Sequence, residues 1–427
     1  MSFKLKILYF FIGLKIQRVL GLLTFDTYLK IKKLFLMKRL KLSKYYNNYN
    51  LSVDNFKNIP IINKEIFMNN FNDINTANIS YNQAIKIAKK AESTRNFNPM
   101  IGDISVGLST GTSGNRGLFL LNENERARWV ALMLDRVIGF SFKKKKVAFF
   151  LRANNKLYES TNSKILSFNF FDIYQKIDSH FKRLSLLQPD ILIAQPSVLK
   201  IIAKSIENRD LKINPTKVIS VAEVLTKEDR LYFESVFKIR LSEVYQCTEG
   251  FLATSCEEGF LHFNEDFLIV EKKFINHEKT KFHPIITDLL RSTQPIVRYE
   301  LNDIVSIKEN CKCGSKFMVI DKVEGRSDDI ISLLDDNEKI VKIFPDILRR
   351  TIVLSDDRIT DYSMIQKTEN ILELYVDSKF SNSFLSAKKS IIKMLEKYNI
   401  SKVEILKSDK LQFTIGDKKR RIKNECK

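Results

Sequence analysis

Short apolar runs alternate with helical patterns through the middle of the chain. Four of these runs are expected to be strands, over residues 147–151, 165–171, 190–194 and 217–222. Between the later runs, apolar residues recur at helical spacing over residues 177–187, 197–208 and 226–237. Strands that alternate with helices predict an α/β domain with a largely parallel sheet.

Polar residues follow the predicted strands. They are Arg152-Ala-Asn-Asn155, Gln195, Ala222-Glu223 and, further on, Tyr245-Gln-Cys-Thr-Glu249. Ligands of parallel α/β sheets bind at the carboxyl ends of the strands, so these residues are candidates for a binding site.

Other patterns flank this domain. Residues 1–60 and 79–96 are predicted to be helical, and Asn122 followed by Glu123 and Glu125 is typical of a helix start. Beyond residue 260 the apolar spacing becomes strand-like, and a fresh α+β pattern follows residue 330. We therefore expect an N-terminal helical segment over 1–75, an α/β body over 76–327 and a small C-terminal domain over 328–427.

A loop rich in glycine and hydroxyl side chains lies between the helix at 79–96 and the helix after Asn122. Its glycines are Gly111, Gly114 and Gly117, and its hydroxyls belong to Ser109, Thr110, Thr112 and Ser113. Glycine allows close backbone approach, and hydroxyls add donors beside exposed N–H groups, which is chemistry for holding phosphate. The loop matches neither a P-loop nor a G-x-G-x-x-G motif, and an ordinary surface turn is the alternative.

The chain carries a large positive charge. It has 71 Lys and Arg against 50 Asp and Glu, a net charge of +21. The basic residues are scattered, so we expect no nucleic-acid partner. No window has the ~18 uninterrupted apolar residues of a membrane-spanning helix.

The N-terminus combines apolar residues at helical spacing (Phe3, Ile7, Phe10, Leu14) with lysines and arginines. It either packs against the body of the protein or attaches peripherally to an anionic membrane. Five cysteines in so long a chain form no even disulfide framework, which indicates a cytoplasmic protein. If the N-terminus attaches to a membrane, the protein would lie at the inner face of that membrane.

Four separated stretches form a recognisable series: Ser109-Thr-Gly-Thr-Ser-Gly114, Tyr245-Gln-Cys-Thr-Glu249, the segment from Thr287-Asp-Leu through Pro295-Ile-Val-Arg-Tyr299 to Asp303, and Gly325-Arg-Ser-Asp-Asp329. In this order they resemble motifs of the superfamily of AMP-forming adenylating enzymes, which includes acyl-CoA ligases. The third resembles the phenylacetate-CoA ligase branch. Within it the chain is similar to adenylate-forming enzymes related to deazaflavin-coenzyme adenylating synthetases and to a protein linked with capsule biosynthesis.

The resemblance implies a fold and a set of roles. The fold is a large acyl-CoA synthetase-like N-terminal body with a small C-terminal domain. The loop from Ser109 to Gly114, with Thr110, Gly111, Thr112 and Ser113, would hold the phosphates of ATP. The other implied roles are Glu249 for Mg²⁺, Thr248 for the α-phosphate, Asp303 for the ribose, Ala222, Glu223, Tyr245 and Gln246 for adenine, Arg326 for ribose or phosphates, and Asp328 as the pivot of the small domain. The structural alternatives are a helix-starting Glu249, a turn residue at Asp303 and a surface ion pair for Arg326.

Two positions depart from the family pattern. Asn115 and Arg116 follow Gly114 where the family usually has Gly-Lys-Pro, so a phosphate-binding cation would be Arg116 or lie elsewhere. Asp417 stands where the family has its catalytic lysine, and Lys418 comes one residue later. Either Lys418 substitutes or that lysine is missing.

A second constellation combines Cys256, His262, Cys311 and Cys313. Three thiolates and one imidazole make a closed tetrahedral set typical of structural Zn²⁺, and buried free cysteines with a chance histidine are the alternative.

We therefore expect an ATP-dependent adenylate-forming ligase that activates a carboxylate as acyl-AMP and releases pyrophosphate, with coenzyme A as a further acceptor. The alternatives are adenylyl transfer to a hydroxyl and a non-catalytic nucleotide-binding protein of an envelope-polysaccharide pathway. Arg152, the residues to Asn155, and Tyr158 could line an acceptor pocket or form a structural turn.

Overall fold

The computed structural model describes residues 1–427 except 21–24, 95–97, 110–115, 140–142, 152–165, 327–328, 357, 381, 411–419 and 427. The chain divides into two compact units. Unit 1 comprises residues 1–301 and 307–321, and unit 2 comprises residues 302–306 and 322–427. None of the helices in the described ranges is long and apolar enough to cross a membrane.

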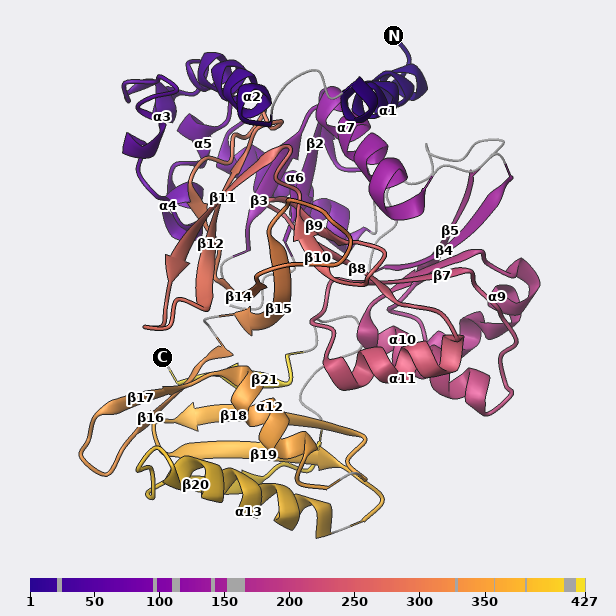
Figure 1. Cartoon of the computed structure of the whole chain (residues 1–427), viewed down its shortest axis with the longest axis vertical. Helices are drawn as coiled ribbons and strands as arrows, with labels where there is room; N and C mark the ends of the chain where they lie inside the picture. Colours follow the sequence, from indigo (N-terminus) through magenta and orange to yellow (C-terminus); the bar gives the residue numbers. More distant parts are fainter. Residues whose placement is uncertain are drawn as a thin grey trace. The chain divides into compact units, whose positions relative to one another are not determined.

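A parallel sheet forms the middle of unit 1, as the alternating pattern predicts (Figure 1). Its strands, in the order in which they lie side by side, are β8 (Ser242–Cys247), β7 (Lys217–Val221), β6 (Ile191–Ala194), β4 (Lys145–Leu151) and β5 (Leu166–Asp172). Each is parallel to its neighbour. Because the strands are parallel, their carboxyl ends share one edge of the sheet.

Helices from the segments between these strands bury the apolar side of the sheet. They are the 3₁₀ turn η3 (Ile177–His180), α9 (Phe181–Leu187), α10 (Pro196–Glu207) and α11 (Lys227–Phe237). Fully buried side chains such as Phe150, Ile202 and Phe233 join strands and helices in one core.

The sheet continues with antiparallel strands. These are β9 (Gly250–Ser255), β10 (Leu261–Phe263) and β15 (Val319–Arg326), which pair in that order beside β8. Three further antiparallel strands are β11 (Leu268–Phe274), β12 (Lys281–Asp288) and β13 (Tyr299–Glu300), and β14 (Asp303–Lys308) follows them in the chain.

The N-terminal part of unit 1 is helical. Its elements are α1 (Phe3–Leu20), α2 (Phe25–Leu40), α3 (Lys44–Asn47), η1 (Phe56–Asn58), α4 (Lys64–Asn69), α5 (Phe71–Ile74) and α6 (Tyr81–Ser93). A small antiparallel sheet of β1 (Met100–Ile101), β2 (Ile104–Leu108) and β3 (Leu118–Leu121) leads to α7 (Glu123–Met133) and a π-helical turn, η2 (Leu134–Ile138). The predicted helix start is confirmed, because Asn122 and Glu125 form a capping box at α7.

Unit 2 has a four-stranded sheet covered by two helices. Its elements are β16 (Ile331–Leu334), β17 (Ile340–Ile343), α12 (Pro345–Val353), β18 (Asp361–Thr368), β19 (Ile371–Asp377), α13 (Asn382–Glu396), β20 (Glu404–Lys407) and β21 (Ile422–Asn424). The sheet order is β20-β19-β18-β21, and β16 and β17 form a separate hairpin. Leu348, Met364 and Ile391 are fully buried in its core.

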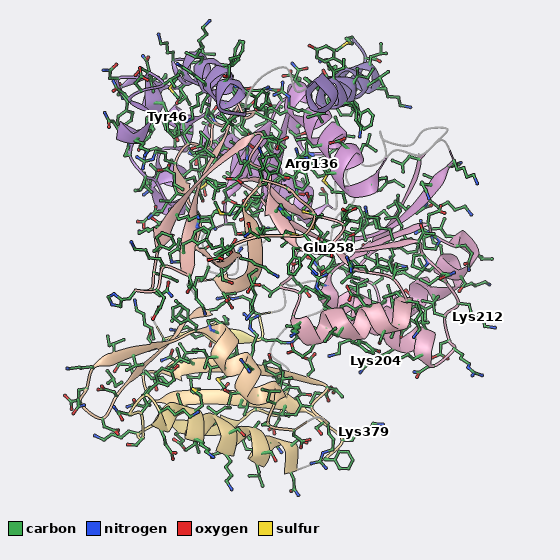
Figure 2. All side chains as sticks on the ribbon, viewed as in Figure 1. Tyr46, Arg136, Lys204, Lys212, Glu258 and Lys379 are labelled. Carbon is green, nitrogen blue, oxygen red and sulfur yellow. The ribbon has the colours of Figure 1, made fainter. Side chains whose placement is uncertain are left out.

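Basic side chains lie on both units. Lys204 and Lys212 of unit 1 and Lys379 of unit 2 point outward (Figure 2).

Candidate functional site

The polar residues predicted at the carboxyl ends of the parallel strands share one sheet edge. Ala222 and Glu223 follow β7, and Thr248 and Glu249 follow its neighbour β8. Ala222 has a φ of 68°, a left-handed backbone conformation that is uncommon for alanine. Strain of this kind collects at functional sites, so the turn after β7 is a strong candidate for ligand contact.

The Glu223 side chain binds the N-terminus of helix α10 at this edge of the sheet. Its carboxylate accepts hydrogen bonds from the Ser197 N–H (3.1 Å) and the Ser197 hydroxyl (3.0 Å) in the first turn of α10. A carboxylate at a helix N-terminus is favoured by the helix dipole. The side chain of Glu223 therefore positions the turn, and its backbone and Ala222 are the parts suited to face a ligand.

Two hydroxyls orient the Glu249 carboxylate. The Thr248 hydroxyl donates to Oε2 at 2.8 Å, and the Tyr299 hydroxyl donates to Oε1 at 3.0 Å. Glu249 is half-buried, whereas Tyr299 is buried with its ring edge-on to Phe67. Each carboxylate oxygen keeps a further lone pair, so Glu249 is an oriented, hard oxygen ligand of the kind Mg²⁺ prefers.

A buried arginine fixes the backbone of the same turn. Arg291 Nη1 donates to the carbonyls of Thr248 (2.9 Å) and Glu249 (3.2 Å). Asp288 accepts from the backbone N–H of Leu290 and of Arg291, and burial raises the pKa of Asp288 while the Arg291 charge acts against that rise. Sequence reasoning missed Arg291, since its partners are backbone carbonyls more than 40 residues away.

Residues 294–299, which we call the clasp, form hydrogen bonds with segments that are distant in the sequence. Gln294 is fully buried, and its amide joins the N–H of Leu120 to the carbonyl of Leu118 in β3. Arg298 binds Glu271 with two nitrogens and donates to the carbonyl of Ile59 at 2.6 Å. This clasp holds Tyr299 in place against Glu249.

A second buried carboxylate joins α7 to the segment just before this clasp. Glu125 accepts from the N–H of Asn122 and from the N–H and hydroxyl groups of Ser292 and Thr293. Five donors on one carboxylate make it a rigid anchor. The sequence placed Glu125 at the start of a helix, and the structure adds its hydrogen bonds with Ser292 and Thr293.

The glycine-rich loop is described only at its two ends. Ser109 N–H donates to the Gly117 carbonyl and Gly117 N–H donates to Ser109 Oγ, both at 2.7 Å, which closes the neck of the loop. Arg116 donates to the Ser109 carbonyl (2.8 Å) and to both carboxylate oxygens of Glu92 (2.6 and 2.8 Å). The hydrogen bond to Glu92 raises the pKa of Arg116.

Unit 2 brings together two of the residues expected to meet the nucleotide. Arg326 Nε lies 3.6 Å from Asp303 Oδ1. Next to them in sequence, Asp329 accepts from Arg420 Nε at 2.6 Å, and burial raises the pKa of Asp329 while the Arg420 charge acts against that rise. The structure therefore shows Arg326 in an ion pair with another candidate ligand residue.

Several predicted site residues lie outside the described part of the chain. They are Thr110, Gly111, Thr112, Ser113, Gly114, Asn115, Arg152, the residues to Asn155, Tyr158, Asp328, Asp417 and Lys418. Tyr245 and Gln246 are described: they lie at an irregularity in the pairing of β8 with β9, where Tyr245 is half-buried and Gln246 is exposed.

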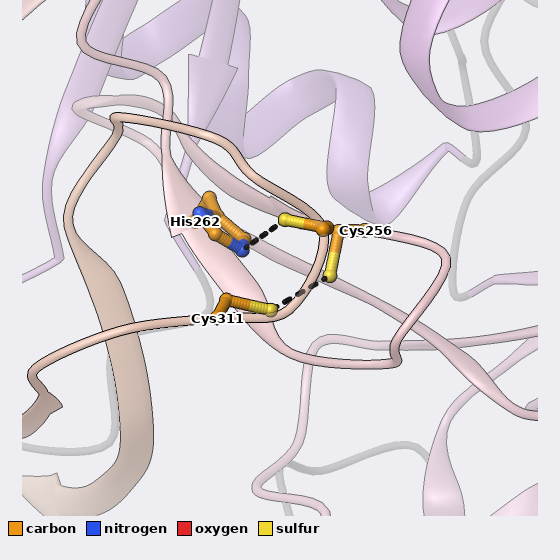
Figure 3. Close-up of side chains that lie close together, drawn as sticks. Cys256, His262 and Cys311 are labelled. Atoms are coloured by element: carbon orange, nitrogen blue, oxygen red, sulfur yellow. Dashed lines mark hydrogen bonds between the residues drawn. The ribbon is translucent and has the colours of Figure 1, made fainter.

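The four predicted metal ligands converge from three segments of unit 1. Figure 3 labels three of them, Cys256, His262 and Cys311. The ligand atoms of Cys256, His262, Cys311 and Cys313 all lie within 4.8 Å of one another. Cys256 Sγ is 3.7 Å from Cys311 Sγ, and Cys313 Sγ is 3.4 Å from His262 Nε2. Two thiolates on one zinc at about 2.3 Å would be about 3.8 Å apart, so these separations fit a tetrahedral ion.

The surroundings of the cluster orient the His262 ring and change the pKa values of two of the thiols in opposite directions. His262 Nδ1 lies 3.1 Å from the Phe317 carbonyl, which fixes the ring with Nε2 toward the sulfurs. Burial raises the pKa of the Cys311 thiol, but hydrogen bonds from Cys313 and His262 outweigh this and lower it to about 7. Burial raises the pKa of Cys256 to about 11.

Comparison with known proteins identifies the fold. A scan against models of protein families finds no match, and a search of curated protein sequences also finds none. Among solved structures, 2-hydroxyisobutyryl-CoA ligase in the postadenylation state, in complex with an acyl-AMP, is similar with a TM-score of 0.66 at 12% identity, over 92% of this chain and 88% of that chain.

Two further solved structures resemble the chain over a smaller share. An ATP-bound RpMatB–BxBclM chimera matches with a TM-score of 0.54 at 12% identity, over 73% of this chain and 65% of that one. The amide bond synthetase McbA from Marinactinospora thermotolerans matches with a TM-score of 0.54 at 7% identity, over 74% and 67%. The chain therefore has the fold of adenylate-forming, acyl-CoA synthetase-like enzymes, with a C-terminal domain, as expected from the sequence.

Proposed function

We propose that this protein is an ATP-dependent adenylate-forming ligase. A carboxylate oxygen of the substrate attacks the α-phosphorus of ATP, the bond to the β-phosphate oxygen breaks, and acyl-AMP and pyrophosphate are the products. The observation that carries the proposal is the oriented carboxylate of Glu249, held by Thr248 and Tyr299 at the carboxyl end of β8. This fold has been solved with acyl-AMP and with ATP in other proteins.

The chemistry requires stabilisation of negative charge on the phosphates. Mg²⁺ would supply that positive charge when bound, and Glu249 is the residue proposed to hold it. Arg291 holds the backbone of the Thr248–Glu249 turn through hydrogen bonds to both carbonyls. The Glu249 carboxylate therefore needs no reorganisation during the reaction. Thr248 is proposed to reach the α-phosphate, and Ser109 to Gly114 to hold the β- and γ-phosphates.

The base and ribose have separate proposed partners. Ala222, the backbone of Glu223, Tyr245 and Gln246 are the residues proposed to contact adenine. Asp303 is proposed to accept the ribose hydroxyls, with Arg326 beside it for ribose or phosphate. Asp328 is proposed as the pivot of residues 328–427, and Lys418 as a substitute for the lysine that Asp417 displaces.

The two candidate functions differ in the group that receives the product of the reaction with ATP. Coenzyme A is the proposed acceptor, because the similar 2-hydroxyisobutyryl-CoA ligase has been solved with acyl-AMP and coenzyme A. The alternative is adenylyl transfer from ATP to a hydroxyl. The family's catalytic lysine for carboxylate adenylation would stand at position 417, but this chain has Asp417 there and Lys418 one residue later. This departure from the family pattern supports the alternative.

ATP–pyrophosphate exchange tests the proposal. Purified protein is incubated with Mg²⁺, ATP, labelled pyrophosphate and pools of aryl, fatty and amino acids. We expect exchange with one acid class, and its loss in Glu249→Gln. Glu257→Gln changes an exposed acid on the turn after β9 and should exchange normally. Intact ATP binding without exchange in any pool would refute acyl adenylation, and a thioester formed with coenzyme A would exclude the hydroxyl acceptor.

We further propose that Cys256, His262, Cys311 and Cys313 bind a structural Zn²⁺ that ties the β9–β10 hairpin to residues 311–313. The supporting observation is the tetrahedral spacing of the four ligand atoms. Elemental analysis should find about one zinc per chain in the wild type and in Cys426→Ser, and none in Cys256→Ser/Cys313→Ser. Equal metal content in all three proteins would refute the site. We propose a reducing, cytoplasmic compartment, because five cysteines in so long a chain form no even disulfide framework.

A further inference from the structure

Helix α1 has apolar side chains on two opposite faces. Phe3, Ile7, Phe10, Phe11 and Leu14 pack against α7, where they meet buried residues including Ala127 and Val130. The other face carries a second series, which we call the α1 stripe: Leu5, Leu8, Tyr9, Ile12 and Ile16. These side chains are 45–65% exposed.

The α1 stripe is continuous. Its residues follow the i, i+3, i+4, i+7 spacing of one helix face and lie within about 100° of the helix circumference. A contiguous exposed apolar surface of this kind marks an interaction site, whereas single exposed apolar residues do not.

Helix α2 lies at the same end of unit 1 and has a similar exposed face (Figure 1). Ile31, Leu34 and Phe35 are exposed at helical spacing, and Leu36, Met37 and Leu40 are buried on its other side. Lys30, Lys38 and Lys41 are exposed next to this apolar face. Helix α2 therefore combines an apolar face with exposed positive charge, whereas Lys6 and Lys15 of α1 pair with Glu123 and Asp135.

The N-terminal residues 1–42 carry mostly positive charge. Residues 1–42 include ten lysines and arginines but a single acidic residue, Asp26. Arg128 of α7 lies over the Phe10 ring at 4.5 Å, and Arg39 of α2 donates to the carbonyls of Leu289 and Leu290. Burial lowers the pKa of Lys32, and the nearby charges of Arg128 and Arg39 lower it further. This crowding of positive groups favours an anionic partner.

We propose that the exposed faces of α1 and α2 bind the surface of a bilayer that contains anionic lipids. The apolar side chains enter the boundary between headgroups and acyl chains, and the lysines contact lipid phosphates. A second copy of this chain is the less suitable occupant, because two such surfaces facing each other would bring together like charges without acidic partners.

Vesicle flotation with the full-length protein tests this proposal. The probes are vesicles of phosphatidylcholine alone and vesicles with about one third phosphatidylglycerol. We expect binding to the anionic vesicles, weak binding to the neutral ones, and a decrease in affinity as salt is raised. Absence of binding to anionic vesicles, or equal binding to both kinds, would overturn the proposal.

Two sets of substitutions separate the contributions of apolar and of charged side chains to vesicle binding. Leu8→Ser/Tyr9→Ser/Ile12→Ser should lower the affinity about 100-fold, roughly fivefold for each half-exposed side chain. Lys30→Gln/Lys38→Gln/Lys41→Gln should also lower it about 100-fold, at about fivefold per lysine.

The matched control is Tyr174→Ser/Leu186→Ser/Leu231→Ser. It removes three side chains of similar size and exposure from other surfaces of unit 1 and should bind vesicles like the wild type. Unchanged thermal unfolding confirms that each variant folds. If sedimentation shows a wild-type dimer that Leu8→Ser/Tyr9→Ser/Ile12→Ser converts to a monomer, the stripe covers a second copy and the membrane proposal is wrong.

Discussion

The Tyr299 hydroxyl offers a direct test of how the candidate site is built. Tyr299→Phe removes one oxygen atom and keeps the buried ring and its contact with Phe67, whose centroid lies 5.3 Å away. The change deletes the 3.0 Å hydrogen bond to Glu249 Oε1 and leaves the Thr248 bond to Oε2 intact. A hydrogen bond to a charged acceptor is worth about 1.5–3 kcal/mol, which corresponds to about 10–150-fold in binding.

Tyr299→Phe should weaken only the part of ATP binding that depends on Mg²⁺. If Glu249 holds Mg²⁺, a partner that orients its carboxylate should matter by about 10–100-fold in metal-dependent affinity. We expect calorimetric titration of Tyr299→Phe with ATP to show this loss with Mg²⁺ present and little change without it. Pyrophosphate exchange should fall by a similar factor.

Tyr232→Phe is the matched control, because the Tyr232 hydroxyl donates to Glu207 at 2.6 Å on the surface of α10 and α11. It should bind ATP like the wild type. In a Glu249→Gln background, Tyr299→Phe should have little further effect, since the charged acceptor is gone. An equal loss with and without Mg²⁺, or full additivity of the two substitutions, would refute the role of Glu249.

Two further predictions concern stability. Hydrogen bonds from Arg358 hold the pKa of the Asp356 carboxyl well below its usual range. The stability that this carboxylate contributes is therefore fully present above about pH 4 and decreases progressively as the pH falls below that value. The melting temperature of Asp356→Asn should be below that of the wild type at pH 7, and the difference should become smaller as the pH is lowered toward 2. Arg291→Met should lower the free energy of unfolding by about 2–4 kcal/mol, because the turn carbonyls and Asp288 lose a buried cation, and urea unfolding followed by fluorescence measures this; a loss below about 0.5 kcal/mol would contradict the role of Arg291.

The sequence alone determined the local structure and the fold class. The apolar runs correspond to β4, β5, β6 and β7, and the helical patterns between them to α9, α10 and α11. These predictions succeeded because the spacing of apolar residues is itself the cause of burial on one face. The capping box at Asn122 is likewise a contact between neighbours in sequence, and it is where the pattern placed it.

The sequence also selected candidates for the site without their partners. Glu249 was chosen from its motif, but the sequence gives no sign that Tyr299, 50 residues later, donates to it. Arg291 contacts backbone carbonyls, which every residue has, so no residue pattern could identify it. The four metal-ligand candidates were named from residue type, and the folded chain brings them within 4.8 Å of one another.

The choice between the two apolar faces of α1 was made by tertiary structure alone. Both faces have helical spacing in the sequence, and both carry large apolar side chains. Packing against Ala127 and Val130 of α7 buries one face and leaves the α1 stripe exposed. Local periodicity thus fixes which residues share a face, whereas burial, orientation and hydrogen-bond partners depend on segments that are distant along the chain and meet only when it folds.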